Sequence, residues 1–345
     1  MPFDTTRFEP LVEELLSALE SSLSYRILVL IIGRPGSGKT TISQYLEDQL
    51  NERYRRNDNK LVPFSSDYFN LQHLDFTKEF EAARPLPIDL EEAETQINHD
   101  IDNPDFPSIP YNDSTTLKII GRGLLSTLIN VKTESAVSIH HPIPPFAKHI
   151  SMDGFHLPRS VLGHMTNSQN MFLRRGFPDS FDSDLVVKLV QLLTDICYDT
   201  TVTAAGHQAN LANALWMFDS LPGSPSISIP DFDHRLKDPT PDASIIAPST
   251  RVIILEGNYL MLNQGRWAEI SEIVRRNKQN NVLVWKVVPA NKDEVRERTA
   301  KRHVTAGICN TLDEGYQRYD ANDKLNGDLI DDSSNNEYID KFIVN

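Results

Sequence analysis

Cysteine is scarce in this sequence: only Cys197 and Cys309 occur among 345 residues, and they lie far apart. Neither belongs to a Cys-x-x-Cys pair or to a Cys/His spacing typical of zinc ligands, so the sequence suggests neither a zinc site nor a disulfide framework. Few cysteines are typical of a reducing compartment. The N-terminal residues also lack an apolar signal core, and their acidic side chains are unlike a transit peptide. We therefore expect a cytoplasmic protein.

Long apolar runs and an excess of positive charge are also lacking. No stretch reaches the about 20 apolar residues of a membrane-spanning helix, so we expect no membrane span. The 34 lysines and arginines are outnumbered by 48 aspartates and glutamates, which gives a formal charge of −14. This charge disfavours nonspecific binding to nucleic acid, and we expect no nucleic-acid partner. The sequence leaves the oligomeric state open, with a monomer favoured.

A phosphate-binding pattern follows a predicted buried strand near the N-terminus. Residues Ile27–Ile32 are all apolar, as in a parallel strand covered on both faces. The next residues, Gly33–Thr40, match the pattern Gly-x-x-x-x-Gly-Lys-Thr, and a helical pattern follows, a context that argues against a chance surface loop. In such a loop, backbone N–H groups surround phosphate oxygens and the lysine contacts the β- and γ-phosphates. The predicted nucleotide ligands are Gly33, Arg34, Pro35, Gly36, Ser37, Gly38, Lys39, Thr40 and Thr41.

Two further apolar strands run directly into a carboxylate. Phe146–Met152 precedes Asp153, and the strand that begins at Arg251 reaches Glu256. Ligands of open parallel sheets bind at the carboxyl ends of the strands, so we expect both carboxylates at the edge that carries the phosphate-binding loop. Solid apolar strands separated by helices predict an α/β fold. The predicted architecture is a P-loop NTPase-type three-layer sandwich with a mostly parallel central sheet.

The chain is predicted to consist of a core and one long insertion. Residues 1–56 and 146–345 would form the P-loop core, with a lid near 293–320. Residues 57–145 would form an insertion subdomain, because about ninety residues far exceed the usual connection between two elements. The local patterns further predict a helix over His207–Phe218, a charged loop over Asp231–Pro239 and a surface loop over Asp328–Asn336.

Phosphoryl transfer needs a phosphate site, Mg²⁺, a base beside the acceptor hydroxyl and cations over the transferring group. Thr40 and Glu256 are the expected metal ligands, and Asp153 is the expected base. Arg298 and Arg302 share one face of a predicted helix and are expected to close over the phosphates. Each residue also has a structural alternative: a capping carboxylate for Glu256, a turn former for Asp153 and a solvated helix face for the arginines.

Several motifs together carry a family resemblance. Met152–His156, Arg174–Asp182 and Leu255–Leu260, in this order and spacing, resemble the phosphoribulokinase/uridine kinase/pantothenate kinase family of P-loop kinases. Arg298–His303 and Asn322–Asp323 resemble the lid and the C-terminal signature of the same family. Within it, the chain is most similar to a fungal ATP-dependent kinase of unassigned substrate.

The resemblance implies an ATP-dependent kinase that uses Mg²⁺ and transfers the γ-phosphate to a hydroxyl of a small molecule. That molecule would be nucleoside-, pantothenate- or sugar-like. The catalytic residues would be Asp153, Lys39, Arg302 and Arg298. Residues 176–182 would lie near the acceptor, and the expected acceptor-binding residues are His156, Arg174, Arg175 and Asp182.

Two alternatives stay open at this point. Asp67, within Ser65–Phe69, imitates the strand-end motif and competes with Asp153 as the base, although the spacing to the acceptor motif favours Asp153. A nucleotide switch or assembly ATPase, without a small-molecule acceptor, is the alternative function. A guanine-specific switch would require Asn/Thr-Lys-x-Asp, whereas Asn291–Glu294 ends in glutamate.

Overall fold

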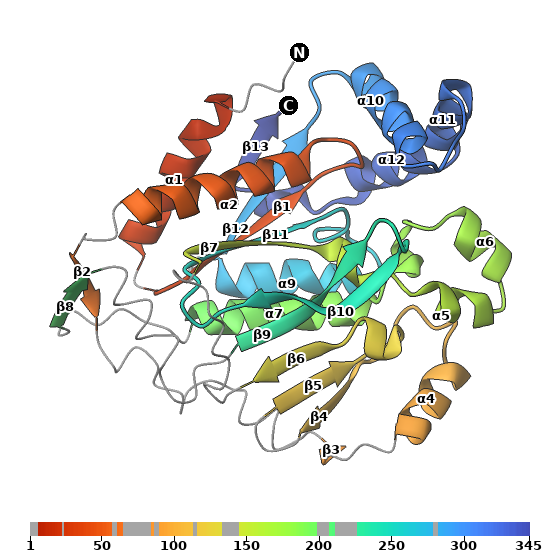
Figure 1. The fold of residues 1–345 in the computed structure, drawn as a ribbon, viewed down its shortest axis with the longest axis horizontal. Coiled ribbons are helices and arrows are strands. Elements are labelled where there is room, and N and C mark those ends of the chain that lie inside the picture. Colours follow the sequence, from red (N-terminus) through yellow and green to blue (C-terminus); the bar gives the residue numbers. More distant parts are fainter. Residues whose placement is uncertain are drawn as a thin grey trace.

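The computed structural model describes residues 6–22, 24–56, 61–64, 84–85, 90–112, 116–132, 145–198, 207–210, 226–278 and 282–345. Its central element is a five-stranded parallel sheet in the order β13-β12-β1-β11-β7 (Figure 1). The strand that precedes the phosphate-binding loop is therefore central. The five strands are β1 (Ile27–Ile32), β7 (Ala147–Ser151), β11 (Val252–Gly257), β12 (Val282–Val288) and β13 (Lys341–Val344).

Helices cover both faces of this sheet, as the alternation of side chains along β1 requires. Val29 and Ile31 belong to a core shared with α1 and α2, whereas Leu28 and Leu30 belong to a core shared with α7 and α9. Because both faces are buried, the strand reads as a continuous apolar run. The predicted three-layer α/β sandwich is confirmed. These helices are α1 (Glu9–Ser21), α2 (Lys39–Arg56), α7 (Ser183–Tyr198) and α9 (Ala268–Asn277).

A second sheet packs beyond α7 and combines strands from two distant parts of the chain (Figure 1). Its order is β10-β9-β6-β5-β4-β3, and Asn130 of β6 pairs with Ser228 of β9. Strands from the 57–145 segment are therefore hydrogen-bonded to strands that follow α7. The strands are β3 (Arg84–Pro85), β4 (Ile109–Asn112), β5 (Thr116–Ile120), β6 (Ile129–Lys132), β9 (Ser226–Asp233) and β10 (Asp238–Ile246).

The remaining helices lie around the carboxyl edge of the central sheet or beside the second sheet. A π-helical turn, Tyr319–Asp323, connects the last two helices of the chain without a break. Such turns frequently mark functional sites. These helices are α4 (Leu90–His99), α5 (Arg159–His164), α6 (Ser168–Leu173), α10 (Lys292–Thr305), α11 (Leu312–Arg318) and α12 (Lys324–Ser333).

Three local predictions were wrong. The polar segment that begins at Asp328 is helical through Ser333, because Ile330 is fully buried and distant ion pairs hold the acidic residues. The charged segment Asp231–Pro239 is a hairpin between β9 and β10, and the Asp233 carboxylate accepts hydrogen bonds from the turn N–H groups. His207–Asn210 forms strand β8, antiparallel to β2 (Leu61–Phe64), instead of a helix; residues 211–218 lie outside the described residues.

No helix among the described residues is long and apolar enough to cross a membrane.

The central strand should dominate the stability of the fold. Leu30 is completely buried in β1, so Leu30→Ala is expected to lower the free energy of unfolding by about 2–5 kcal/mol. The matched substitution Leu173→Ala, at a side chain 64% exposed, should change it by no more than about 0.5 kcal/mol. Urea unfolding followed by circular dichroism measures both values. Equal effects of the two substitutions would contradict the assigned core.

Candidate active site

The phosphate-binding loop connects β1 to α2 and has the backbone geometry that its glycines allow. Gly36 has a φ of 74°, and a Cβ at this position would overlap the Thr299 hydroxyl of α10. Only glycine meets both conditions without strain. The loop therefore lies directly against α10, and several of its residues line the pocket described below.

Lys39 is buried at the start of α2, and its ammonium group donates to oxygens on both sides. It lies 2.9 Å from the Gly33 carbonyl oxygen and 2.8 Å from Asn258 Oδ1. Burial lowers the pKa of Lys39, and the nearby carboxylates of Glu256 and Asp153 partly offset that effect. The lysine is thus held in place beside the loop by neutral oxygens that a phosphate group can replace.

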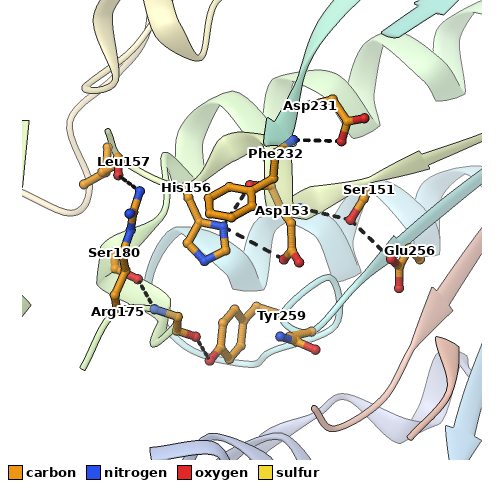
Figure 2. Close-up of polar contacts among 12 residues, drawn as sticks. Ser151, Asp153, His156, Leu157, Arg175, Ser180, Asp231, Phe232, Glu256 and Tyr259 are labelled. Atoms are coloured by element: carbon orange, nitrogen blue, oxygen red, sulfur yellow. Dashed lines mark hydrogen bonds and ion pairs between the residues drawn. The ribbon is translucent and has the colours of Figure 1, made fainter. Parts of the chain in front are cut away.

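Glu256, at the end of β11, accepts hydrogen bonds from hydroxyl groups on two other elements. Thr40 Oγ1 lies 2.7 Å and Ser151 Oγ lies 3.2 Å from the same carboxylate oxygen, and His149 Nε2 lies 3.8 Å from it (Figure 2 shows the Ser151 contact). Burial alone would raise the pKa of Glu256, but His149, Lys39 and Thr40 together lower it. The carboxylate is therefore ionised.

Asp153 lies one strand further along the same edge, in a short 3-10 turn after β7. Its backbone N–H donates to Ser151 Oγ, and its carboxylate is 43% exposed. His156 Nδ1 donates to the Asp153 carbonyl oxygen at 2.8 Å, so the Nε2 atom of the neutral ring is the acceptor (Figure 2). Burial lowers the pKa of His156 despite the nearby Asp153, and its ring packs against Phe181.

One pocket of about 440 Å³ unites most of these groups. Arg298 Nε donates to the Gly36 carbonyl at 2.8 Å, while its Nη2 atom is buried and has no hydrogen-bond partner among the described residues. The structure brings the predicted residues Lys39, Thr40, Asp153, His156, Arg175, Glu256, Arg298 and Arg302 into the lining of this pocket, together with Pro35, Gly36, Gly38 and Thr41 of the loop.

Three predicted site residues have their side chains elsewhere. The Arg34 guanidinium is 2% exposed and pairs with carboxylates of α12. Arg174 contacts amide side chains of Asn322 and Asn326 instead of the pocket. The Asp182 carboxylate is buried beneath the pocket, where it accepts hydrogen bonds from the Gly123 N–H and the Thr127 hydroxyl.

Two residues of the phosphate-binding loop, Gly33 and Ser37, also lie outside the pocket lining. Asp67 lies outside the described residues.

Sequence reasoning also missed several residues that line the pocket. Asn258 and the pair Asn322–Asp323 belong to motifs that carried the family resemblance, so their positions gave a signal without a role. Asn326 and Asn345 gave none. Asn345 lies at the end of β13, and its Nδ2 atom donates to the Ser37 carbonyl at 2.6 Å. Only the folded sheet brings that asparagine to the loop.

The phosphate-binding loop, the two strand-end carboxylates and the arginines of α10 together define a P-loop kinase. No family model matches the chain. ATP-dependent kinase YFH7 of Kluyveromyces lactis is 34% identical over 348 residues, covering 95% of this chain and 94% of the relative. The namesake from Lachancea thermotolerans is 32% identical and covers 94% of each chain. The chain therefore belongs to the family of ATP-dependent kinase YFH7, and its activity depends on ATP.

Solved structures agree with this assignment. YFH7 of Saccharomyces cerevisiae, a P-loop protein provisionally assigned as a kinase with a circular permutation, superposes with a TM-score of 0.73 at 27% identity over 98% of both chains. A protein of Silicibacter sp. TM1040, provisionally assigned as a fructose transport system kinase, shares the fold, with a TM-score of 0.51 at 17% identity over 96% of this chain and 97% of that one. The predicted resemblance to P-loop kinases is confirmed.

The burial of Asp182 predicts a pH effect on stability and none on the nucleotide site. Burial raises the pKa of Asp182 in the folded state, so the folded protein holds this proton more tightly than the unfolded chain does. Stability from this group is therefore greatest at low pH and is lost as the pH rises through the raised pKa. Asp182→Asn removes the titration. Urea unfolding between pH 4 and 7 should show that the free energy of unfolding falls with pH in the wild type and not in the variant. The affinity for ATP should be the same in both proteins. Parallel pH profiles of the two proteins would contradict the raised pKa of Asp182.

Proposed function

We propose that this ATP-dependent kinase transfers the γ-phosphate of ATP to a hydroxyl group of a small molecule, with Mg²⁺ bound at Thr40 and Glu256. The observation that carries the proposal is the position of Asp153. Its carboxylate is partly exposed and lines the same pocket as Lys39 and Arg298. A nucleotide switch requires no proton acceptor beside its phosphate site, whereas transfer to an alcohol does.

The donor set at Glu256 fits Mg²⁺. An ionised carboxylate and the Thr40 and Ser151 hydroxyl groups meet at one oxygen, and hard oxygen donors of this kind suit the ion. Mg²⁺ is commonly bound by one or two carboxylates together with substrate phosphates and water. Thr40 and Glu256 would hold the ion, which would neutralise charge on the phosphates.

The chain's own residues supply the remaining parts of the reaction. Lys39 and the N–H groups of the loop bind the phosphates, and Arg298 with Arg302 neutralises charge that develops on the transferring group. Asp153 accepts the proton of the acceptor hydroxyl while that oxygen forms its bond to the γ-phosphorus. The bond from the γ-phosphorus to the bridging oxygen breaks, and ADP leaves.

The acceptor side of the pocket favours a hydroxyl-rich molecule. His156 is neutral and offers its Nε2 lone pair, so it can accept a hydrogen bond from a second hydroxyl group. Arg175 also faces this side, but its charge is balanced by Asp238 at 2.8 Å. Nucleoside-, pantothenate- and sugar-like molecules share this chemistry.

The two free, buried cysteines support a cytoplasmic location for the reaction, since reduced thiols persist there.

The test is an acceptor screen. Purified protein with ATP and Mg²⁺ is incubated with panels of nucleosides, pantothenate-like vitamins and sugars, and ADP release is measured with and without each candidate. We expect at least one candidate to stimulate ADP release and to appear as its phosphate ester by mass spectrometry. Hydrolysis that no alcohol stimulates, but that a protein partner does, would favour the switch or assembly ATPase instead.

Lys39→Ala is expected to reduce ATP turnover about 10²–10³-fold or more, because the phosphates lose their buried cation. The matched control Lys301→Ala removes an ammonium group that pairs with Glu297 on the exposed side of α10. Coupled-enzyme measurement of ADP release compares the two variants. Turnover that survives Lys39→Ala at the level of the control would contradict the assigned phosphate site.

Asp153→Asn separates transfer from binding. The substitution keeps the shape of the side chain but removes its basicity, so transfer should fall about 10²–10⁴-fold. The affinity for ATP, measured by calorimetry, should change by less than about threefold because Lys39 and the loop are intact. Asp67→Asn is the informative comparison: if it abolishes transfer while Asp153→Asn does not, Asp67 is the base.

A further inference from the structure

Helix α12 and the π-helical turn before it contact two separate segments that line the pocket. One segment is the phosphate-binding loop, through Arg34, whose neighbours Pro35 and Gly36 line the pocket. The other is Arg174–Gly176, on the acceptor side. Figure 1 shows α12 beside α10 and α11, at the end of the molecule that carries the loop. The proposed chemistry assigns no role to this helix.

The contact with the loop is a buried guanidinium group between two carboxylates. Arg34 Nη1 lies 2.8 Å from Asp331 Oδ2, and Arg34 Nη2 lies 3.3 Å from Asp328 Oδ1. The guanidinium lies against Gly327, where a Cβ would come within 2.6 Å of Nη2. Because Arg34 is buried, it cannot exchange these partners for water without a large cost. Its position therefore follows that of α12.

The contact with the acceptor side uses two asparagines one helical turn apart. Asn322 Nδ2 donates to the Arg175 carbonyl at 3.2 Å, and Asn326 Nδ2 donates to the Gly176 carbonyl at 3.3 Å. Their amide oxygens accept from the Arg174 guanidinium at 3.2 and 3.4 Å. Each asparagine thus binds both the backbone and the Arg174 side chain, which fixes this segment in two directions.

The two contacts lie on opposite sides of the helix. At about 100° per residue, Asp328 is rotated about 200° and Asp331 about 140° from Asn326. The helix therefore contacts the phosphate-binding loop with one side and the segment Arg174–Gly176 with the other.

We propose that α12, with the turn Tyr319–Asp323, is a positioning element that sets the separation between the phosphate-binding loop and the acceptor-side segment. Arg34, Asp331 and Arg174 act as positioning residues through it. Displacement of a reacting group by about 1 Å can cost about 10²-fold in rate, so a rigid connection between donor and acceptor sides has a direct catalytic value.

Amide hydrogen exchange tests the connection without any acceptor. Asp331→Asn weakens the contact with Arg34, and Arg174→Ala removes the contact with the asparagines. If α12 connects the two sides, each substitution should speed exchange about threefold or more at the far segment as well as the near one. Peptides that cover residues 33–40 and 174–181 report the two segments in the full-length protein.

Asp332→Asn is the matched control, because it makes the same chemical change at an exposed neighbour. Exchange that changes only at the near segment of each variant, or equally in the control, would overturn the proposal. Arg174→Lys keeps the charge but cannot contact both amides, and it tests transmission from the acceptor side should Asp331→Asn prove unstable.

A kinetic arm rests on the proposed function. With an alcohol found in the screen, Asp331→Asn should lower kcat about tenfold to hundredfold while KM for ATP changes less than about threefold. A rise in KM for ATP with unchanged kcat would assign Arg34 to nucleotide binding alone. Failure of the screen leaves the exchange experiment decisive, so failures of the two proposals are distinguishable.

Discussion

The hydrogen bond between Thr40 and Glu256 exists because two adjacent parallel strands are in register. Ile31 of β1 lies opposite Glu256 of β11, so the loop that follows β1 begins where the carboxylate emerges. The next strand, β7, pairs Ser151 with Glu256 and ends just before Asp153. One pattern of backbone hydrogen bonds therefore determines the order of the phosphate-binding loop, Glu256 and Asp153 along the edge. A shift in register would separate all three.

Two buried charges of opposite sign lie at the same edge of the sheet and stabilise each other. Lys39 and Glu256 are both buried, and an isolated ion of either sign would be very costly there. Each lowers the cost of the other, and neutral donors and acceptors from Asn258, Ser151 and Thr40 complete their shells. The site is thus charged before any ligand arrives, a property that favours phosphoryl transfer.

The sequence predicted those parts of the site that short contiguous motifs encode. The run Ile27–Ile32 and the following glycines identify the loop, and strand-end positions place Asp153 and Glu256 at one edge. The sequence could not show which of Arg174 and Arg175 lines the pocket, because their partners lie far away in the chain. Arg174 contacts Asn322 and Asn326, whereas Arg175 pairs with Asp238. The family resemblance implied that Asp182 lies near the acceptor. Gly123 and Thr127, from the connection between β5 and β6, instead donate hydrogen bonds to its buried carboxylate.

The acidic segment that begins at Asp328 shows why predictions from sequence fail where a segment is held by distant contacts. Its composition matches a solvated loop, and nothing within it indicates that Arg34, almost three hundred residues earlier, pairs with two of its carboxylates. Motifs reveal groups that touch a ligand because ligand chemistry restricts residue type over a few consecutive positions. The distances between those groups depend on other contacts, in which residue type is less restricted. Any pair of complementary side chains can form such a contact. A helix that sets distance therefore looks ordinary in sequence, and its role emerges from the geometry of both its faces.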